Sequence, residues 1–186
     1  MRKLAIIGIA AAGVLCAGNG LYESANQKVE RIIAERAAPG STIHLSLEEI
    51  NALVRGKIRE KKIEGISNPR VELGEGRGTW SGTVEFAKLP QLASLRDNFL
   101  VGSLLQGSKP VAATLRLQSG GGRATIDVEQ VKIGDTEFSG SILGFLVEKL
   151  VLDDFPNAKI GEPFPLEHNV DEIRLRPDGI LIKIKN

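Results

Sequence analysis

Three pairs of short strand patterns, each joined by a tight turn, constrain the fold of this chain most strongly. The pairs are 70–73 with 79–87, 111–117 with 124–133, and 170–176 with 180–184. Along these segments apolar and polar side chains alternate, as in a sheet with one face on a core and the other in water. Because strands joined by tight turns pair antiparallel, the sequence predicts an antiparallel sheet of about six strands in hairpins.

Two local features of these hairpins can be predicted. In the second hairpin the apolar positions change from Ile126 and Val128 to Val131 and Ile133. One extra residue in a strand causes such a change, so a β-bulge is expected near Gln130. In the third hairpin the turn at 177–179 reads Pro-Asp-Gly, which predicts a positive φ angle at Asp-Gly. The isoleucines that follow this turn are expected to point into the core.

Two helical patterns precede the first hairpin. Residues 21–38 have an apolar stripe on one side and charged residues on the other, and a Pro-Gly pair follows them. The second pattern, 46–58, follows a short extended piece. It opens with Ser46 and Glu49 at the spacing of a capping box, in which the two side chains satisfy free N–H groups of the first turn. Asn51 lies beside the apolar stripe of this helix, and we expect its side chain to bond nearby backbone.

The most apolar run beyond the N-terminal leader is 139–155. Drawn as a helix, it has apolar side chains over well over half of its circumference, whereas an ordinary surface helix needs a stripe of about 100°. Residues 89–107 also have helical spacing and become more apolar toward their end. Burying one large apolar side chain is worth about 1.5–3 kcal/mol, so these segments should be covered. Either they pack on one another and on the sheet, or they leave an elongated apolar cleft for an acyl chain.

A cleft of this kind would be lined by large apolar side chains from the sheet and from both helical segments. The candidates are Trp80, Phe86, Phe99, Leu104, Phe145, Leu146 and Leu150. Trp80 and Phe86 come from the first hairpin, while Phe99 and Leu104 would lie at the mouth of the cleft as a lid. The remaining three would come from the long apolar helix.

Residues 1–20 have the pattern of a signal peptide or an N-terminal membrane anchor. Two basic residues are followed by an apolar run, 4–17, and then by small residues. The single cysteine, Cys16, lies in this leader, and the large Leu15 before it disfavours lipidation. The rest of the chain, 21–186, therefore has no thiol chemistry. We expect an exported, periplasmic or otherwise extracytoplasmic protein of one α+β domain, either soluble or anchored by its leader.

No catalytic or metal-binding constellation is visible. His44 and His168 have no histidine partner at metal-ligand spacing, and no Gly-x-Ser-x-Gly motif occurs. The glycine clusters fall in hairpin turns and not before helices, which disfavours phosphate binding. The chain carries 24 basic and 23 acidic residues, so nothing indicates nucleic acid as a partner. We expect no enzymatic activity, no metal and no cofactor.

The order of these features resembles a known group of proteins. An amphipathic helix followed by Leu-Ser-Leu-Glu-Glu-Ile-Asn-Ala-Leu at 45–53 looks like the opening of small bacterial envelope proteins of the YpmS-like kind. Paired strands, an apolar helix ending near Phe155 and a closing hairpin with Arg-Pro-Asp-Gly-Ile at 176–180 follow in the same order. The resemblance implies an architecture similar to the tubular lipid-binding fold, in which a strongly curved antiparallel sheet wraps a long helix. It implies a lipid-binding groove and no reaction.

Two functions are compatible with these expectations. In the first, the protein is a non-enzymatic envelope protein that binds a lipid or another apolar ligand in a groove between the sheet and the apolar helix. In the second, it is a structural or interaction module of the envelope with a fully packed core and no ligand. The expected partners are a lipid or acyl chain, a membrane surface or inner-membrane anchor, and an envelope protein.

Overall fold

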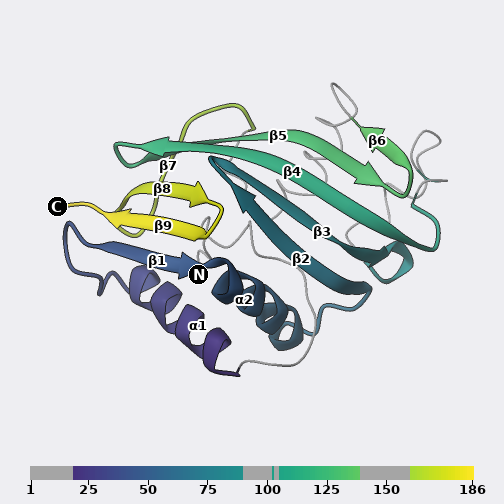
Figure 1. Ribbon diagram of the computed structural model, residues 1–186, viewed down its shortest axis with the longest axis horizontal. Helices are drawn as coiled ribbons and strands as arrows, with labels where there is room; N and C mark the ends of the chain where they lie inside the picture. The colour runs from purple at the N-terminus through teal and green to yellow at the C-terminus, as the bar shows by residue number, and fades with distance from the viewer. Residues whose placement is uncertain (1–18, 90–101, 103–104, 139–159) are drawn as a thin grey trace.

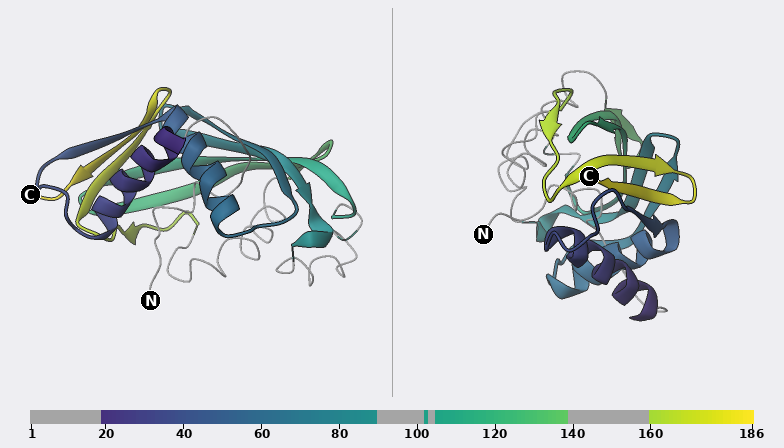
Figure 2. Two further views of the ribbon diagram at one scale, coloured as in Figure 1. Left: turned by 90° about the horizontal axis from the view of Figure 1, so that it is seen from below. Right: turned by 90° about the vertical axis from the view of Figure 1, so that its left-hand side faces the viewer.

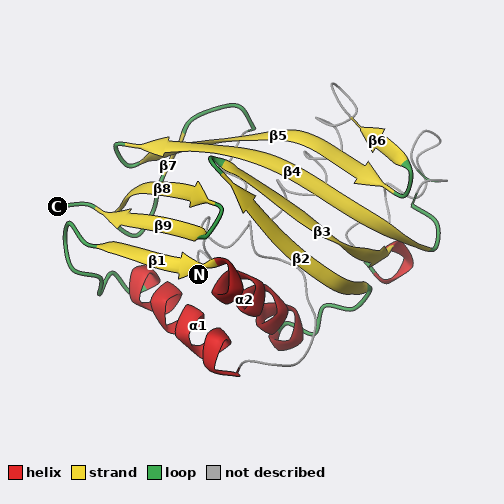
Figure 3. Cartoon of the chain, in the orientation of Figure 1, coloured by secondary structure: helices red, strands yellow, loops and turns green. Residues whose placement is uncertain are grey.

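The structure is a computed structural model that describes residues 19–89, 102, 105–138 and 160–186. Within these residues the chain forms two antiparallel sheets and two α-helices (Figures 1 and 3). The helices are α1 (Asn19–Ile33) and α2 (Leu47–Glu60), and η1 (Phe86–Lys88) is a single 3-10 turn. The predicted α+β class is therefore confirmed. None of the described helices is both long and apolar enough to span a membrane.

The long sheet contains five strands in consecutive order and a sixth, very short strand beside β5. They are β2 (Ile66–Gly74), β3 (Arg77–Glu85), β4 (Ser108–Gly120), β5 (Arg123–Ile133), β6 (Thr136–Phe138) and β7 (Phe164–Pro165). The first two predicted hairpins are thus confirmed, although β3 ends at Glu85 because the chain turns into η1 there. Figure 2 shows that this sheet is curved and twisted along its length.

The third predicted hairpin does form, but it lies in a different sheet. β8 (Val170–Arg176) and β9 (Gly179–Ile184) pair with each other, and β9 also pairs with β1 (Thr42–Ser46). The predicted antiparallel sheet of about six strands is therefore confirmed, but the third hairpin is not part of it, contrary to the prediction. The extended piece before α2 supplies the third strand, because its residues occupy the free edge of β9 from Thr42 to Ser46.

Both predicted features of the hairpins are found. Thr114 pairs with Gln130 and Leu115 with Val128, so Glu129 is the extra residue of a bulge next to the predicted position. Gly179 has a φ of +155°, and a Cβ atom there would clash with the carbonyl group of Leu45. A second bulge, in β2 between residues 67 and 70, was not predicted.

The main core lies between the two helices, the three-stranded sheet and one end of the long sheet. Its buried members include Ala25, Val29 and Ile32 of α1, Ile50, Leu53 and Val54 of α2, Ile173 and Leu175 of β8, and Ile180, Ile182 and Ile184 of β9. The isoleucines after the turn therefore point inward as predicted, whereas Leu181 is partly exposed. Figure 1 places both helices beside β1 and β2, away from β6.

The capping box at the start of α2 is confirmed and also holds α1. The Glu49 N–H donates to the Ser46 hydroxyl at 3.2 Å, and the Ser46 N–H donates to the Glu49 carboxylate at 2.9 Å. Lys28 and Ser24 of α1 donate to the same carboxylate at 2.7 and 2.6 Å. Burial would raise the pKa of Glu49, but the hydrogen bonds from Lys28, Ser24 and Ser46 outweigh it and lower the pKa.

Asn51 bonds backbone as predicted, and its partner is the free edge of β2. Its Oδ1 accepts from the Val71 N–H, and its Nδ2 donates to the carbonyls of Val71 and Leu47, each at 2.9 Å. The Asn51 side chain thus makes the two backbone hydrogen bonds at Val71 that a neighbouring strand would otherwise make. Because an unpaired strand edge invites association with other chains, this contact protects the edge of the long sheet.

The edge of β8 is covered in a similar way, and this joins the two sheets. The Ser119 hydroxyl donates to the Ile173 carbonyl at 2.7 Å and accepts from the Ile173 N–H at 2.6 Å. The N–H groups of Gly76 and Gly122 donate to the carbonyls of Leu175 and Asp171. The two sheets are therefore connected by hydrogen bonds, although no strand ladder runs between them.

Helix α1 is shorter than predicted, ending at Ile33 and not at residue 38. Glu35 adopts a left-handed conformation with a φ of +53°, and the Arg36 N–H donates to the Arg31 carbonyl. This is the hydrogen-bond pattern of a helix C-terminus, usually made by glycine. The predicted helix 139–155, most of the predicted segment 89–107 and nearly all of the leader lie outside the described residues.

Candidate functional site

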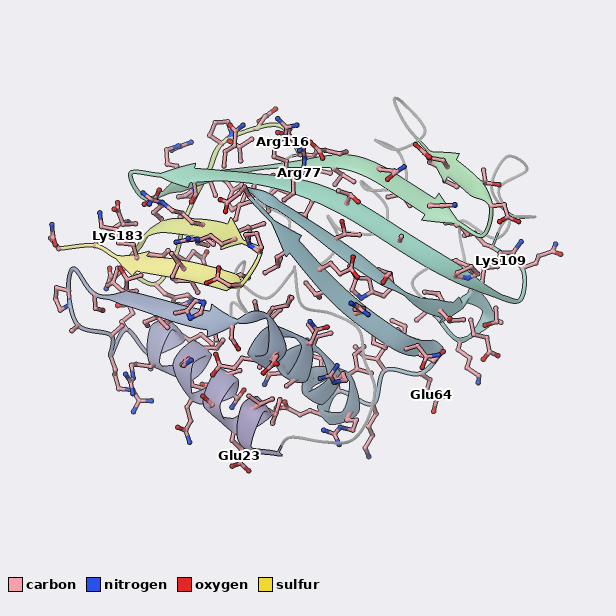
Figure 4. The ribbon with its side chains drawn as sticks, viewed as in Figure 1. Glu23, Glu64, Arg77, Lys109, Arg116 and Lys183 are labelled. Carbon is pink, nitrogen blue, oxygen red and sulfur yellow. The ribbon has the colours of Figure 1, made fainter. Side chains whose placement is uncertain are left out.

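The two faces of the long sheet differ sharply in character. On the outer face, Thr79 of β3 contacts Thr114 of β4, with 3.1 Å between their hydroxyl oxygens. Arg77 and Arg116 both donate to the carboxylate of the bulged Glu129, at 2.8 and 2.7 Å (Figure 4). Hydrogen bonds from Arg77 and then Arg116 lower the pKa of Glu129. This face is polar and partly exposed, and its charged groups are paired with one another.

The inner face carries a band of apolar side chains that are only partly buried. We define this inner stripe as Trp80 of β3, Val111, Ala113 and Leu115 of β4, and Ile126 and Val128 of β5. The strand register brings its members together, since Trp80 pairs with Ala113, and Leu115 pairs with Val128. The bulge at Glu129 then shifts the inward positions of β5 to Val131 and Ile133.

The inner stripe lies between two buried clusters. At one end it adjoins the main core, against which Trp80, Leu115 and Ile126 pack. At the other end is a second cluster, the far cluster, whose members come from β3, η1, β5, β6 and their connections. It consists of Val84, Phe86, Leu89, Leu105, Val131, Ile133 and Phe138. Neither α1 nor α2 contributes a member, so the described helices bury only one end of the inner face.

Trp80 is the largest side chain of the inner stripe and packs against both clusters. Its ring lies over Gly82, where an added Cβ would come within 2.9 Å of the Trp80 Cζ2 atom. Trp80 is partly exposed as a residue, but its Nε1 atom is buried and has no hydrogen-bond partner among the described residues. Buried donors are normally paired, and leaving one unpaired costs about 1–3 kcal/mol.

Two of the seven predicted cleft residues can be placed. Phe86 belongs to the far cluster and is 4% exposed, and Trp80 packs against the same cluster, so the structure brings the pair together. Phe99, Leu104, Phe145, Leu146 and Leu150 lie outside the described residues. The remaining members of the inner stripe were not predicted as site residues, although their alternation was visible in the sequence. Recognising them required the register of β3, β4 and β5.

Other polar groups in the described part of the chain offer weaker candidates. No three potential metal ligands come together there. His44 lies 3.9 Å from Asp178, and His168 lies 3.9 Å from both Glu35 and Glu167, with Nε2 of His168 buried. These contacts link structural elements, and neither histidine lies beside a nucleophile.

Two shallow hollows occur on the outer surface. One, of about 400 Å³, lies at the junction of β4 and β8 and includes Ser119, Arg174 and Arg176. The other, of about 230 Å³, lies on the three-stranded sheet and shares Arg174 with the first. Arg174 donates to Glu172 at 2.7 Å, so its charge is already paired. The inner stripe is therefore the stronger candidate site.

Comparison with protein-family models, with curated protein sequences and with solved structures finds no match for this chain. The candidate site consequently rests on geometry alone.

Proposed function

We propose that this chain is a non-enzymatic, extracytoplasmic protein that binds an acyl chain along the inner stripe. The observation that carries the proposal is a continuous apolar band, from Leu115 through Trp80 to Val111, that is only partly buried although both of its ends lead into buried clusters. Apolar surface removed from water contributes about 25 cal/mol per Å², so covering such a band favours binding.

The shape of the site favours an elongated ligand. The inner positions of β4 from Leu117 to Val111 are all apolar and follow one strand, with about 6.8 Å between successive side chains on the same face. A hydrocarbon chain lying along the strand would contact several of them in turn. Export through the leader at 1–20 forms part of the same proposal, since it would bring the protein to the membrane surface where acyl chains are available.

A structural or interaction module remains the second candidate function. It is favoured by the far cluster, whose seven members are all at most 8% exposed without any added ligand. In that case the inner stripe would be covered by protein only, and the envelope partner would bind elsewhere.

Trp80 allows a direct test, because it is the only tryptophan in the chain. Acyl chains that carry bromine atoms should quench its fluorescence if they bind along the inner stripe, since the heavy atom would lie in contact with the indole ring. Native mass spectrometry of the same samples should show one bound acyl chain per protein. Absence of both quenching and adducts would leave the structural module as the better account.

A further inference from the structure

The C-terminal end of α2, which lies beside the start of α1, presents a cluster of basic side chains. We infer that this surface docks on the anionic headgroups of a phospholipid bilayer. Its members are Arg55, Arg59, Lys61 and Lys62, and we call them the basic end. The inference goes beyond the proposed function, because it concerns the surface of a bilayer and needs no acyl chain bound to the inner stripe.

The basic end concentrates positive charge in a chain that is otherwise slightly acidic. Residues 55–64 contain five basic and two acidic residues, whereas the whole chain contains 24 basic and 23 acidic residues. The remainder of the chain therefore has 19 basic and 21 acidic residues. A local excess of this kind favours contact with a surface of opposite charge.

Neighbouring carboxylates do not neutralise the basic end. Glu60 accepts hydrogen bonds from Lys57 at 2.8 Å and from Tyr22 at 2.9 Å, so the acidic residue closest in sequence is engaged by other donors. Glu23 and Glu64 flank this end of α2 in the view of Figure 4. Three of the four members of the basic end are exposed, and none of the four forms an ion pair with another described residue.

The stability of α2 does not account for all of these charges. Cations near the C-terminus of a helix interact favourably with its macrodipole, but the effect falls off within the last turn. Lys57 and Arg59 already occupy that turn, whereas Lys61 and Lys62 follow the last helical residue. The two lysines therefore leave their charges available to a partner.

The N-terminal leader indicates what the partner is, because it joins the described chain at the basic end. The apolar run 4–17 ends two residues before α1 begins at Asn19. Tyr22 follows about 4.5 Å further along the helix, where it donates to Glu60 and its ring lies against Gly56 of α2. A bilayer that holds the apolar run would thus lie beside the basic end, within the distance of about 10 Å over which an anionic surface attracts cations.

The test places the full chain on nanodiscs of phosphatidylcholine alone, or of an equimolar mixture with the anionic phosphatidylglycerol. Acetylation of individual lysines is followed by mass spectrometry on both kinds of disc. Lys61 and Lys62 report on the basic end. Lys132 and Lys185 are the controls, since both are exposed and lie on β5 and after β9, away from the end of α2. The leader is the same in both samples, so the comparison isolates the charge of the headgroups.

We expect Lys61 and Lys62 to react about fivefold more slowly on the anionic discs than on the neutral discs at low salt. High salt should abolish the difference, because it screens the surface charge. Lys132 and Lys185 should react alike on both discs. Arg59→Gln combined with Lys62→Gln should weaken the protection of Lys61, whereas Lys132→Gln combined with Lys185→Gln should leave it unchanged.

Four outcomes would overturn the inference. They are equal reaction of Lys61 and Lys62 on the two discs, equal slowing of all four lysines, protection that persists at high salt, and failure of the full chain to associate with the anionic discs. None of them bears on the inner stripe. Binding of a fluorescent acyl ester, measured without discs, tests the proposed function separately, and its absence would leave the protection of Lys61 and Lys62 unaffected.

Discussion

The two halves of this molecule differ in how completely they bury their apolar side chains. In the near half, formed by α1, α2, the three-stranded sheet and the strand ends that pack on them, Asn51 and Ser119 cover the edges of β2 and β8. The buried carboxylate of Glu49 has three side-chain or backbone donors around it. In the far half, which contains the inner stripe and the far cluster, Trp80 keeps an unpaired donor and its apolar neighbours stay partly exposed.

This difference distinguishes the main core from the region that we propose as the binding site. Buried polar atoms without a partner occur in both halves, at Asn26 and His168 in the near half and at Trp80 in the far half, so the two halves differ in the exposure of their apolar side chains and not in the pairing of their polar groups. The near half should determine the global stability of the chain. The far half should respond most to an apolar ligand.

The largest expected effect is in the near half, at β9. Ile182→Asp should lower the free energy of unfolding by about 4 kcal/mol or more, because Ile182 is 1% exposed and a carboxylate there would lose its water without a partner. Leu181→Asp, on the opposite face of the same strand, should cost much less. Chemical denaturation of both variants measures the difference, and equal losses would contradict the alternation of β9.

A smaller effect is expected at Glu49. Glu49→Gln should cost about 2 kcal/mol at neutral pH, since Lys28 would lose its charged partner in a partly buried contact. The pKa of Glu49 in the folded protein lies below its ordinary value of 4.5, so its contribution to stability is present above pH 4.5 and is lost as the pH falls through the folded-state pKa. The free energy of unfolding, measured by chemical denaturation at several acidic pH values, should therefore change less with pH for Glu49→Gln than for the native protein. An unchanged pH dependence would show that Glu49 contributes little.

The smallest of these effects concerns the far half. Gly82→Ala should lower the free energy of unfolding by about 1–2 kcal/mol and change the emission of Trp80, because the new methyl group would displace the ring. Gly74→Ala in β2 is the matched control, since a Cβ there meets nothing within 4 Å. The same melting temperature and the same tryptophan emission in both variants would contradict the described packing of the Trp80 ring over Gly82.

The parts of the fold that could be predicted from the sequence are those encoded locally. The alternation of β3 to β5, the change of parity at the Glu129 bulge and the capping box of Ser46 with Glu49 each depend on residues close together in the chain. The pairing of β1 with β9 does not, because Thr42 and Lys183 are far apart in sequence and their pairing is decided by the packing of the whole near half.

The same limit applies to the candidate site. Alternation alone placed Trp80 on the inner face, and the structure confirms this position. It could not show that Ala113, Val128 and Trp80 share one partly exposed band, because that depends on the register of three strands and on the bulge. The unpaired Nε1 of Trp80 could not be predicted either, since pairing depends on tertiary neighbours.

Two adjacent alanines of β4 allow the most direct test of the central claim that the inner stripe binds an acyl chain. Ala113 is on the inner face opposite Trp80, and Ala112 is on the outer face opposite Ser81. Ala113→Phe should strongly reduce the binding of a fluorescent fatty acyl ester while the domain stays folded, whereas Ala112→Phe should bind it like the native protein. Equal binding by all three proteins, or no binding by the native protein together with a lower melting temperature for Ala113→Phe, would contradict the claim.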